Sequence, residues 1–124
     1  MVVRADAPVL IVDDNPETRE VLQHVLAIKG YPTATAADGR AALDYLRGGG
    51  DASLIILDLR MPGMDGHAFR AAQMADPSLA DIPVIIFTAS PETDLLRYPA
   101  PLLRKGTDPG ILLALVGAAA RQIH

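Results

Sequence analysis

Four short stretches of the chain are continuously apolar and recur along its length. They are Val9–Val12, Leu54–Leu57, residues 84–87 and a weaker pair at 102–103. None of them alternates with polar residues, which is typical of strands buried on both faces, as in a parallel sheet. A fifth stretch, Thr33–Ala36, is less apolar but β-branched at alternate positions. The pattern predicts five strands.

Helical periodicity fills the intervals between these stretches, and each predicted helix begins at a residue whose side chain can cap it. The start signals are Asn15-Pro16, Asp38, Asp65-Gly66 and Asp108-Pro109. The predicted ends are Lys29-Gly30, the glycines at 48–50, and the residues before Asp76-Pro77. The expected inward-facing positions are Val21, Leu22, Val25 and Leu26, then Ala42, Leu43 and Leu46, then Phe69 and Ala72, and finally Ile111, Leu112, Leu115, Val116 and Ala119.

Alternating strands and helices predict an α/β fold, a doubly wound parallel sheet with helices on both faces. The right-handed crossover rule leaves few topologies for five strands. The flavodoxin-like strand order 2-1-3-4-5 is the commonest, and its ligand site lies at the carboxyl ends of strands 1 and 3. We therefore expect functional residues at those two ends.

Composition narrows the function classes. The 124 residues suffice for one domain, half of them are hydrophobic, and cysteine is absent, so thiolate chemistry is excluded. The net charge of −4 without a basic cluster argues against nucleic-acid binding. No apolar run approaches the ~20 residues of a membrane helix. We expect a single-domain cytoplasmic protein that binds neither nucleic acid nor membrane.

Acidic residues directly follow two of the predicted strands. Asp13 and Asp14 come after the first strand, and Asp58 comes after the third. In the predicted topology these three carboxylates meet, and their mutual repulsion calls for a cation. Hard carboxylate oxygens with room for water and phosphate suit Mg²⁺. Helix capping by Asp13-Asp14 and a polar loop at Asp58 are the competing interpretations, but neither explains why both strands end in acids.

Thr88 and Lys105 follow the fourth and fifth predicted strands. A hydroxyl and an ammonium at the same rim would supply a hydrogen-bond donor and a positive charge for an anion. Taken alone, Thr88 could simply close a strand and Lys105 could be a solvated surface charge. Together with three acids they favour a phosphate site.

At these residues the chain resembles the receiver domain of two-component response regulators. The resemblance rests on 9–14, Ala36-Ala37-Asp38-Gly39, the block LIILDLRMPGMDG at 54–66, Thr88-Ala89 and Lys105. It implies a single receiver domain over 1–124 that is a phosphoacceptor switch rather than a turnover enzyme. A histidine kinase or histidine phosphotransfer protein would be the donor, and the domain would catalyse its own phosphorylation. The implied roles are phosphoacceptor for Asp58, Mg²⁺ ligands for Asp13, Asp14, Asp58 and the Arg60 carbonyl, and phosphoryl contacts for Thr88 and Lys105.

The chain departs from the family pattern after the fourth strand. Lys105 is followed by Gly106 instead of proline, which puts the family's cis peptide bond in doubt. The segment between Thr88 and Lys105 is short and contains Pro91, Pro99 and Pro101, so we expect a shortened or degenerate fourth helix. The family's switch aromatic is replaced by Leu102, with Tyr98 the nearest aromatic residue. Arg60 and Ser90 occupy the two positions that tune dephosphorylation in the family.

Two other functions compete with a phosphoacceptor switch. A receiver fold retained as a phosphorylation-independent interaction scaffold is the main alternative. A metal-dependent phosphatase with an aspartyl nucleophile would need a general acid at Arg60, which arginine cannot supply. We assign no phosphotransfer role to His24, His67 or His124. A homodimer is left open, as are the kinase, the stimulus, the output target and any removed output domain.

Overall fold

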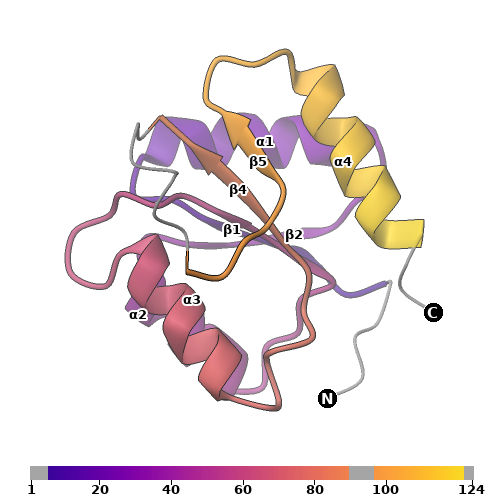
Figure 1. The fold of residues 1–124 in the computed structure, drawn as a ribbon. Coiled ribbons are helices and arrows are strands. Elements are labelled where there is room, and N and C mark those ends of the chain that lie inside the picture. The colour runs from indigo at the N-terminus through magenta and orange to yellow at the C-terminus, as the bar shows by residue number, and fades with distance from the viewer. Residues whose placement is uncertain (1–5, 90–96, 122–124) are drawn as a thin grey trace.

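The computed structural model describes residues 6–89 and 97–121, the side chains of 120 and 121 excepted. Five parallel strands form one sheet in the order β2-β1-β3-β4-β5, and four helices belong to the described residues (Figure 1). The predicted flavodoxin-like topology is confirmed. The elements are β1 (Val9–Val12), α1 (Pro16–Ile28), β2 (Thr33–Ala36), α2 (Gly39–Arg47), β3 (Leu54–Leu57), α3 (Gly66–Ala75), β4 (Val84–Thr88), β5 (Leu102–Arg104) and α4 (Pro109–Arg121).

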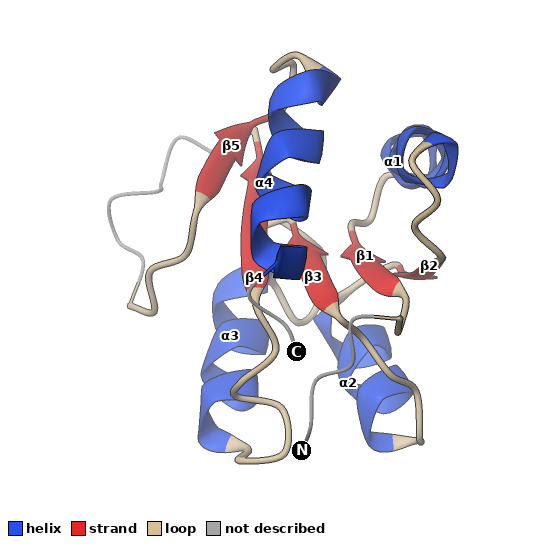
Figure 2. Cartoon of the chain, turned by 90° about the vertical axis from the view of Figure 1, so that its right-hand side faces the viewer, coloured by secondary structure: helices blue, strands red, loops and turns tan. Residues whose placement is uncertain are grey.

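The sheet lies between two pairs of helices. Helices α1 and α4 cover one face, and α2 and α3 cover the other (Figures 1 and 2). Alternate residues of β1 therefore enter different cores: Val9 and Ile11 pack towards α1 and α4, whereas Leu10 and Val12 pack towards α2 and α3. Since both faces are covered, every β1 side chain is buried, which explains the uninterrupted apolar run.

The predicted helix caps are confirmed. Asn15 Oδ1 accepts hydrogen bonds from the backbone N–H groups of Glu17 at 2.9 Å and Thr18 at 3.4 Å. Asp38 and Asp65 each accept one bond from the third residue that follows, at 2.8 and 2.9 Å. These contacts satisfy backbone donors that the first helical turn leaves unpaired.

Two predicted inward-facing residues are exposed. Val21 on α1 is 58% exposed and Ile111 on α4 is 49% exposed. Consecutive helical residues point about 100° apart, so the neighbours Leu22 and Leu112 take the buried positions. The apolar stripe of each helix is thus wider than the face that contacts the sheet.

The departures from the family pattern lie between the end of β4 and the loop that follows β5. Residues 97–101 contain no helix, and residues 90–96, Ser90 and Pro91 among them, lie outside the described part. The predicted shortened helix is therefore tested only over 97–101. After β5 the described backbone has no cis peptide bond, and Gly106 adopts a φ of 94°, which favours glycine.

None of the described helices is both long and apolar enough to cross a membrane.

Candidate functional site

Three carboxylates converge where β1 and β3 end. Asp13 and Asp14 directly follow β1, and Asp58 directly follows β3, its parallel neighbour in the sheet. One ligand oxygen from each of the three lies within 4.8 Å of the others. Asp13 and Asp58 are buried, whereas Asp14 is exposed. The predicted meeting of the three acids is confirmed.

Local hydrogen bonds hold the two buried acids in place. Asp13 Oδ1 accepts from the backbone N–H of Asn15 at 2.9 Å, so this acid is tied to the residue that caps α1. Arg19 reaches back from α1 and donates to the Asp13 carbonyl oxygen at 2.7 Å. The Asp58 backbone N–H donates to the Val12 carbonyl oxygen at 3.0 Å, which fixes the end of β3 against β1.

Thr88 and Lys105 complete the site from the neighbouring strands. Thr88 Oγ1 donates to Asp58 Oδ1 at 2.8 Å. Lys105 Nζ lies 3.0 Å from Asp58 Oδ2 and 2.8 Å from Asp13 Oδ2, so its ammonium bridges the two acids. The Lys105 backbone N–H donates to the Thr88 carbonyl oxygen at 3.1 Å, which aligns the two residues. The structure brings both together with the acids, as the sequence predicts.

Burial and neighbouring charges have opposite effects on the pKa values of Asp13 and Lys105. Burial raises the pKa of the Asp13 carboxyl, and the hydrogen bonds from Lys105 and from the Asn15 N–H only partly oppose it. Burial alone would lower the pKa of Lys105, but the hydrogen bonds and charges of Asp13 and Asp58 outweigh it, so the pKa of Lys105 is raised. The ammonium stays protonated and provides fixed positive charge beside two carboxylates.

The donor set fits a hard divalent cation. Three carboxylates within reach of one another are ligands that Mg²⁺ and Ca²⁺ prefer, and exposed Asp14 leaves one side open to water. A cavity of about 390 Å³ adjoins this side, lined by Asp14, Arg60 and Asp65 among others. Exposed Arg60 lies two residues after Asp58 and donates its backbone N–H to Asp58 Oδ1 at 3.4 Å. Metal coordination by its carbonyl stays a prediction.

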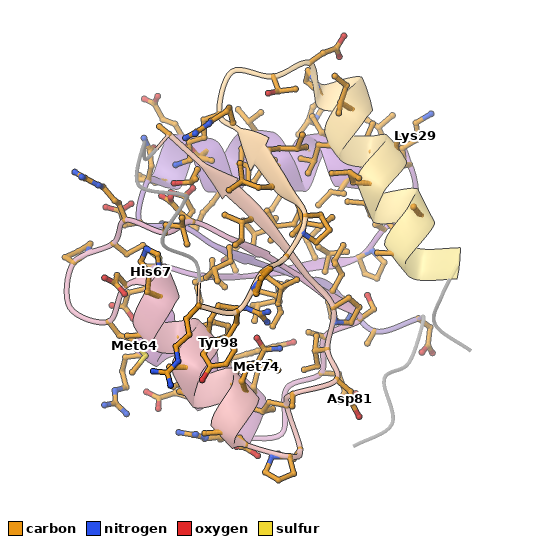
Figure 3. All side chains as sticks on the ribbon, in the orientation of Figure 1. Lys29, Met64, His67, Met74, Asp81 and Tyr98 are labelled. Atoms are coloured by element: carbon orange, nitrogen blue, oxygen red, sulfur yellow. The ribbon has the colours of Figure 1, made fainter. Side chains whose placement is uncertain are left out.

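Sequence reasoning missed two residues around the site. Arg19 reads as a surface residue of an amphipathic helix, and only the fold shows its contact with the Asp13 carbonyl. His67, near the start of α3 (Figure 3), lines the cavity beside Asp14 although no role was expected for it. No periodicity or spacing in the sequence indicates either placement, because each depends on how a helix lies against the end of β1.

A 2-1-3-4-5 parallel sheet with an acid cluster at the ends of β1 and β3 is the arrangement of a receiver domain, and comparison with known proteins identifies the family. The response regulator receiver domain matches residues 9–98, and the chain belongs to this family. It is 35% identical over 105 residues to the probable methanogenesis regulatory protein FilR2 of Methanothrix harundinacea, covering 77% of this chain and 68% of FilR2. The matched part spans only 32% to 36% of three further relatives, all transcriptional or DNA-binding regulators.

Solved receiver structures have the same fold. The signal receiver domain of a histidine kinase from Syntrophus aciditrophicus superposes with a TM-score of 0.87 at 31% identity, covering 94% of this chain and 92% of that one. The response regulator TrrA of Thermotoga maritima, solved with Mg²⁺ and BeF, gives a TM-score of 0.81 at 30% identity, covering 91% and 98%. As a receiver domain of two-component systems, this chain is a phosphoacceptor switch.

Proposed function

We propose that Asp58 is the residue that accepts the phosphoryl group, in a Mg²⁺-dependent reaction with a phosphohistidine donor. One observation supports this most: the buried Asp58 carboxylate contacts both a hydroxyl donor and an ammonium while two further acids lie beside it. The donor would be a histidine kinase or a histidine phosphotransfer protein. Residues 1–124 would form one receiver domain.

Each residue of the site has a specific part in the proposed reaction. An Asp58 carboxylate oxygen attacks phosphorus, the P–N bond to the donor imidazole breaks, and an acyl phosphate forms. Lys105 neutralises charge on the phosphoryl oxygens, since its ammonium already lies 3.0 Å from Asp58 Oδ2. Asp13, Asp14, Asp58 and the Arg60 carbonyl would hold Mg²⁺, which when bound supplies further charge neutralisation and orients the phosphoryl group.

Thr88 links the reaction to a conformational change. Its hydroxyl is buried and donates to Asp58 Oδ1 at 2.8 Å before phosphorylation. An acyl phosphate replaces that carboxylate with a larger group bearing more negative charge and acceptor oxygens. Thr88 would turn to those oxygens, and the segment after β4 would move with it.

Intact-mass spectrometry after incubation with acetyl phosphate and MgCl₂ tests the proposal. Wild type should gain the mass of one phosphoryl group, and the gain should disappear with EDTA and in Asp58→Asn. Asp81→Asn is the matched control, because Asp81 is exposed and its α3–β4 loop lies away from the cluster. A wild-type protein that binds Mg²⁺ but takes up no phosphoryl group from acetyl phosphate or a phosphohistidine donor would contradict the proposal and favour a scaffold.

A further inference from the structure

The first residue of α3 lies against the backbone of the proposed phosphoacceptor. Gly66 is buried, and its N–H donates to the Leu59 carbonyl oxygen at 3.0 Å. A Cβ atom built on Gly66 would overlap the Asp58 carbonyl oxygen and lie 2.8 Å from Leu59 Cα and 3.1 Å from Asp58 C. All three neighbours are backbone atoms, so no side-chain rotation could relieve the overlap.

Asp58 is therefore held from two sides. Its N–H donates to the Val12 carbonyl oxygen of β1, and its carbonyl lies against Gly66 of α3. A side chain at 66 would have to push α3 away or displace the backbone at residues 58–59. Displacement of this backbone would change the 3.0 Å distance from Asp58 Oδ2 to Lys105 Nζ. It would also change the spacing of the Asp13, Asp14 and Asp58 ligand oxygens, which lie within 4.8 Å of one another.

We infer that Gly66 is a positioning residue for Asp58: its missing side chain lets the first turn of α3 set where the acceptor carboxylate and the following carbonyls lie. The inference rests on the proposed function, since it concerns the same metal and phosphoryl site. Residues that orient metal ligands without touching the metal commonly change affinity by about 10- to 100-fold when mutated. Gly66 would act in this way through backbone contact.

Gly66→Ala tests the inference, with Gly50→Ala as the matched control. A Cβ atom on Gly50 would lie 2.6 Å from the Tyr45 carbonyl oxygen and equally close to the Tyr45 ring, so the overlap is comparably tight. Gly50 lies in the loop before β3, whereas Asp58 directly follows β3, so the two residues lie at opposite ends of this strand. Alanine is a better helix former than glycine, so helix propensity cannot account for a loss in Gly66→Ala.

Mg²⁺ alone is titrated into each folded variant and followed by amide NMR shifts, and phosphoryl uptake from acetyl phosphate is measured separately. Gly66→Ala should bind Mg²⁺ about tenfold more weakly than wild type and take up phosphoryl more slowly. Gly50→Ala should lose thermal stability but keep wild-type Mg²⁺ affinity. Wild-type affinity in Gly66→Ala, or an equal loss in both variants, would overturn the inference.

A second pair of variants decides the question if Gly66→Ala does not fold. Asp65→Ala removes the cap that holds the first turn of α3, whereas Asp65→Asn removes the charge but keeps an acceptor for the Ala68 N–H. Asp65→Ala should bind Mg²⁺ more weakly than Asp65→Asn, and equal affinities would overturn the inference. Because these comparisons measure Mg²⁺ binding, they remain decisive even if wild type takes up no phosphoryl group.

Discussion

Lys105 and Arg70 are two cationic side chains that lie largely inside the protein, and the groups that they contact differ in charge. Lys105 Nζ lies within 3.0 Å of two carboxylates. Arg70 on α3 is only 9% exposed, yet its hydrogen bonds to the described residues go to neutral acceptors: Gln73 Oε1 at 2.8 Å and the Tyr98 carbonyl oxygen at 3.3 Å. Its Nε has no hydrogen-bond partner in the described part of the chain. Burial lowers the pKa of Arg70, while the two acids raise the pKa of Lys105.

The difference separates the acid cluster from a structural clamp, the hydrogen-bonded pair Arg70 and Gln73. Gln73 is fully buried and donates to the carbonyl oxygens of Leu79 at 3.1 Å and Ile82 at 3.0 Å. Arg70, which donates to Gln73, also donates to the carbonyl oxygen of Tyr98, and Tyr98 lies over α3 in Figure 3. These bonds join α3 to the loop before β4 and to the segment before β5. The acid cluster brings carboxylates and an ammonium together. Arg70 and Gln73 instead donate hydrogen bonds to backbone carbonyl oxygens.

Lys105→Met should have the largest effect on stability. Without metal it leaves two buried carboxylates uncompensated, and Asp13, whose pKa is already raised, would take up a proton to limit the cost. We expect a loss of about 2–3 kcal/mol in the free energy of unfolding, measured by urea denaturation in EDTA. Saturating Mg²⁺ should reduce the loss, since a cation again neutralises the acids. An equal loss with and without Mg²⁺ would show that the ammonium's charge is not what stabilises the cluster.

Gln73→Ala should cost roughly 2 kcal/mol, because it removes two hydrogen bonds to buried backbone carbonyl oxygens and creates a cavity. Gln23→Ala is the control: Gln23 is half-buried on α1 and makes one 3.2 Å bond, to Thr33 Oγ1. Phosphoryl uptake should stay at the wild-type rate in both variants when measured well below their melting temperatures. Slower phosphoryl uptake in Gln73→Ala would mean that the clamp and the acid cluster are coupled.

The same comparison explains what the sequence could predict. Asp13, Asp14 and Asp58 were predictable because each directly follows an apolar strand, and the topology of a parallel sheet brings such positions together. Arg70 and Gln73 carried no comparable signal, since polar residues in a helix are normally solvated. Their burial depends on where Tyr98 and Leu79 lie, which no local pattern specifies. The prediction that Val21 and Ile111 face inward was wrong because apolar periodicity does not show how wide the buried face of a helix is.

Arg70→Met should have the smallest effect of the three, within about 1 kcal/mol of wild type. The variant loses two hydrogen bonds, worth about 1 kcal/mol each, but it also removes a buried charge that no acid among residues 6–89 and 97–121 pairs with. Methionine can fill the volume of the arginine stem and adapt to the neighbouring cavity of about 470 Å³, which is lined mainly by residues with apolar side chains. Urea denaturation beside Lys105→Met measures the contrast. If Arg70→Met cost as much as Lys105→Met, neutral acceptors alone would suffice to stabilise a buried cation, and pairing with acids would no longer distinguish the acid cluster from the clamp.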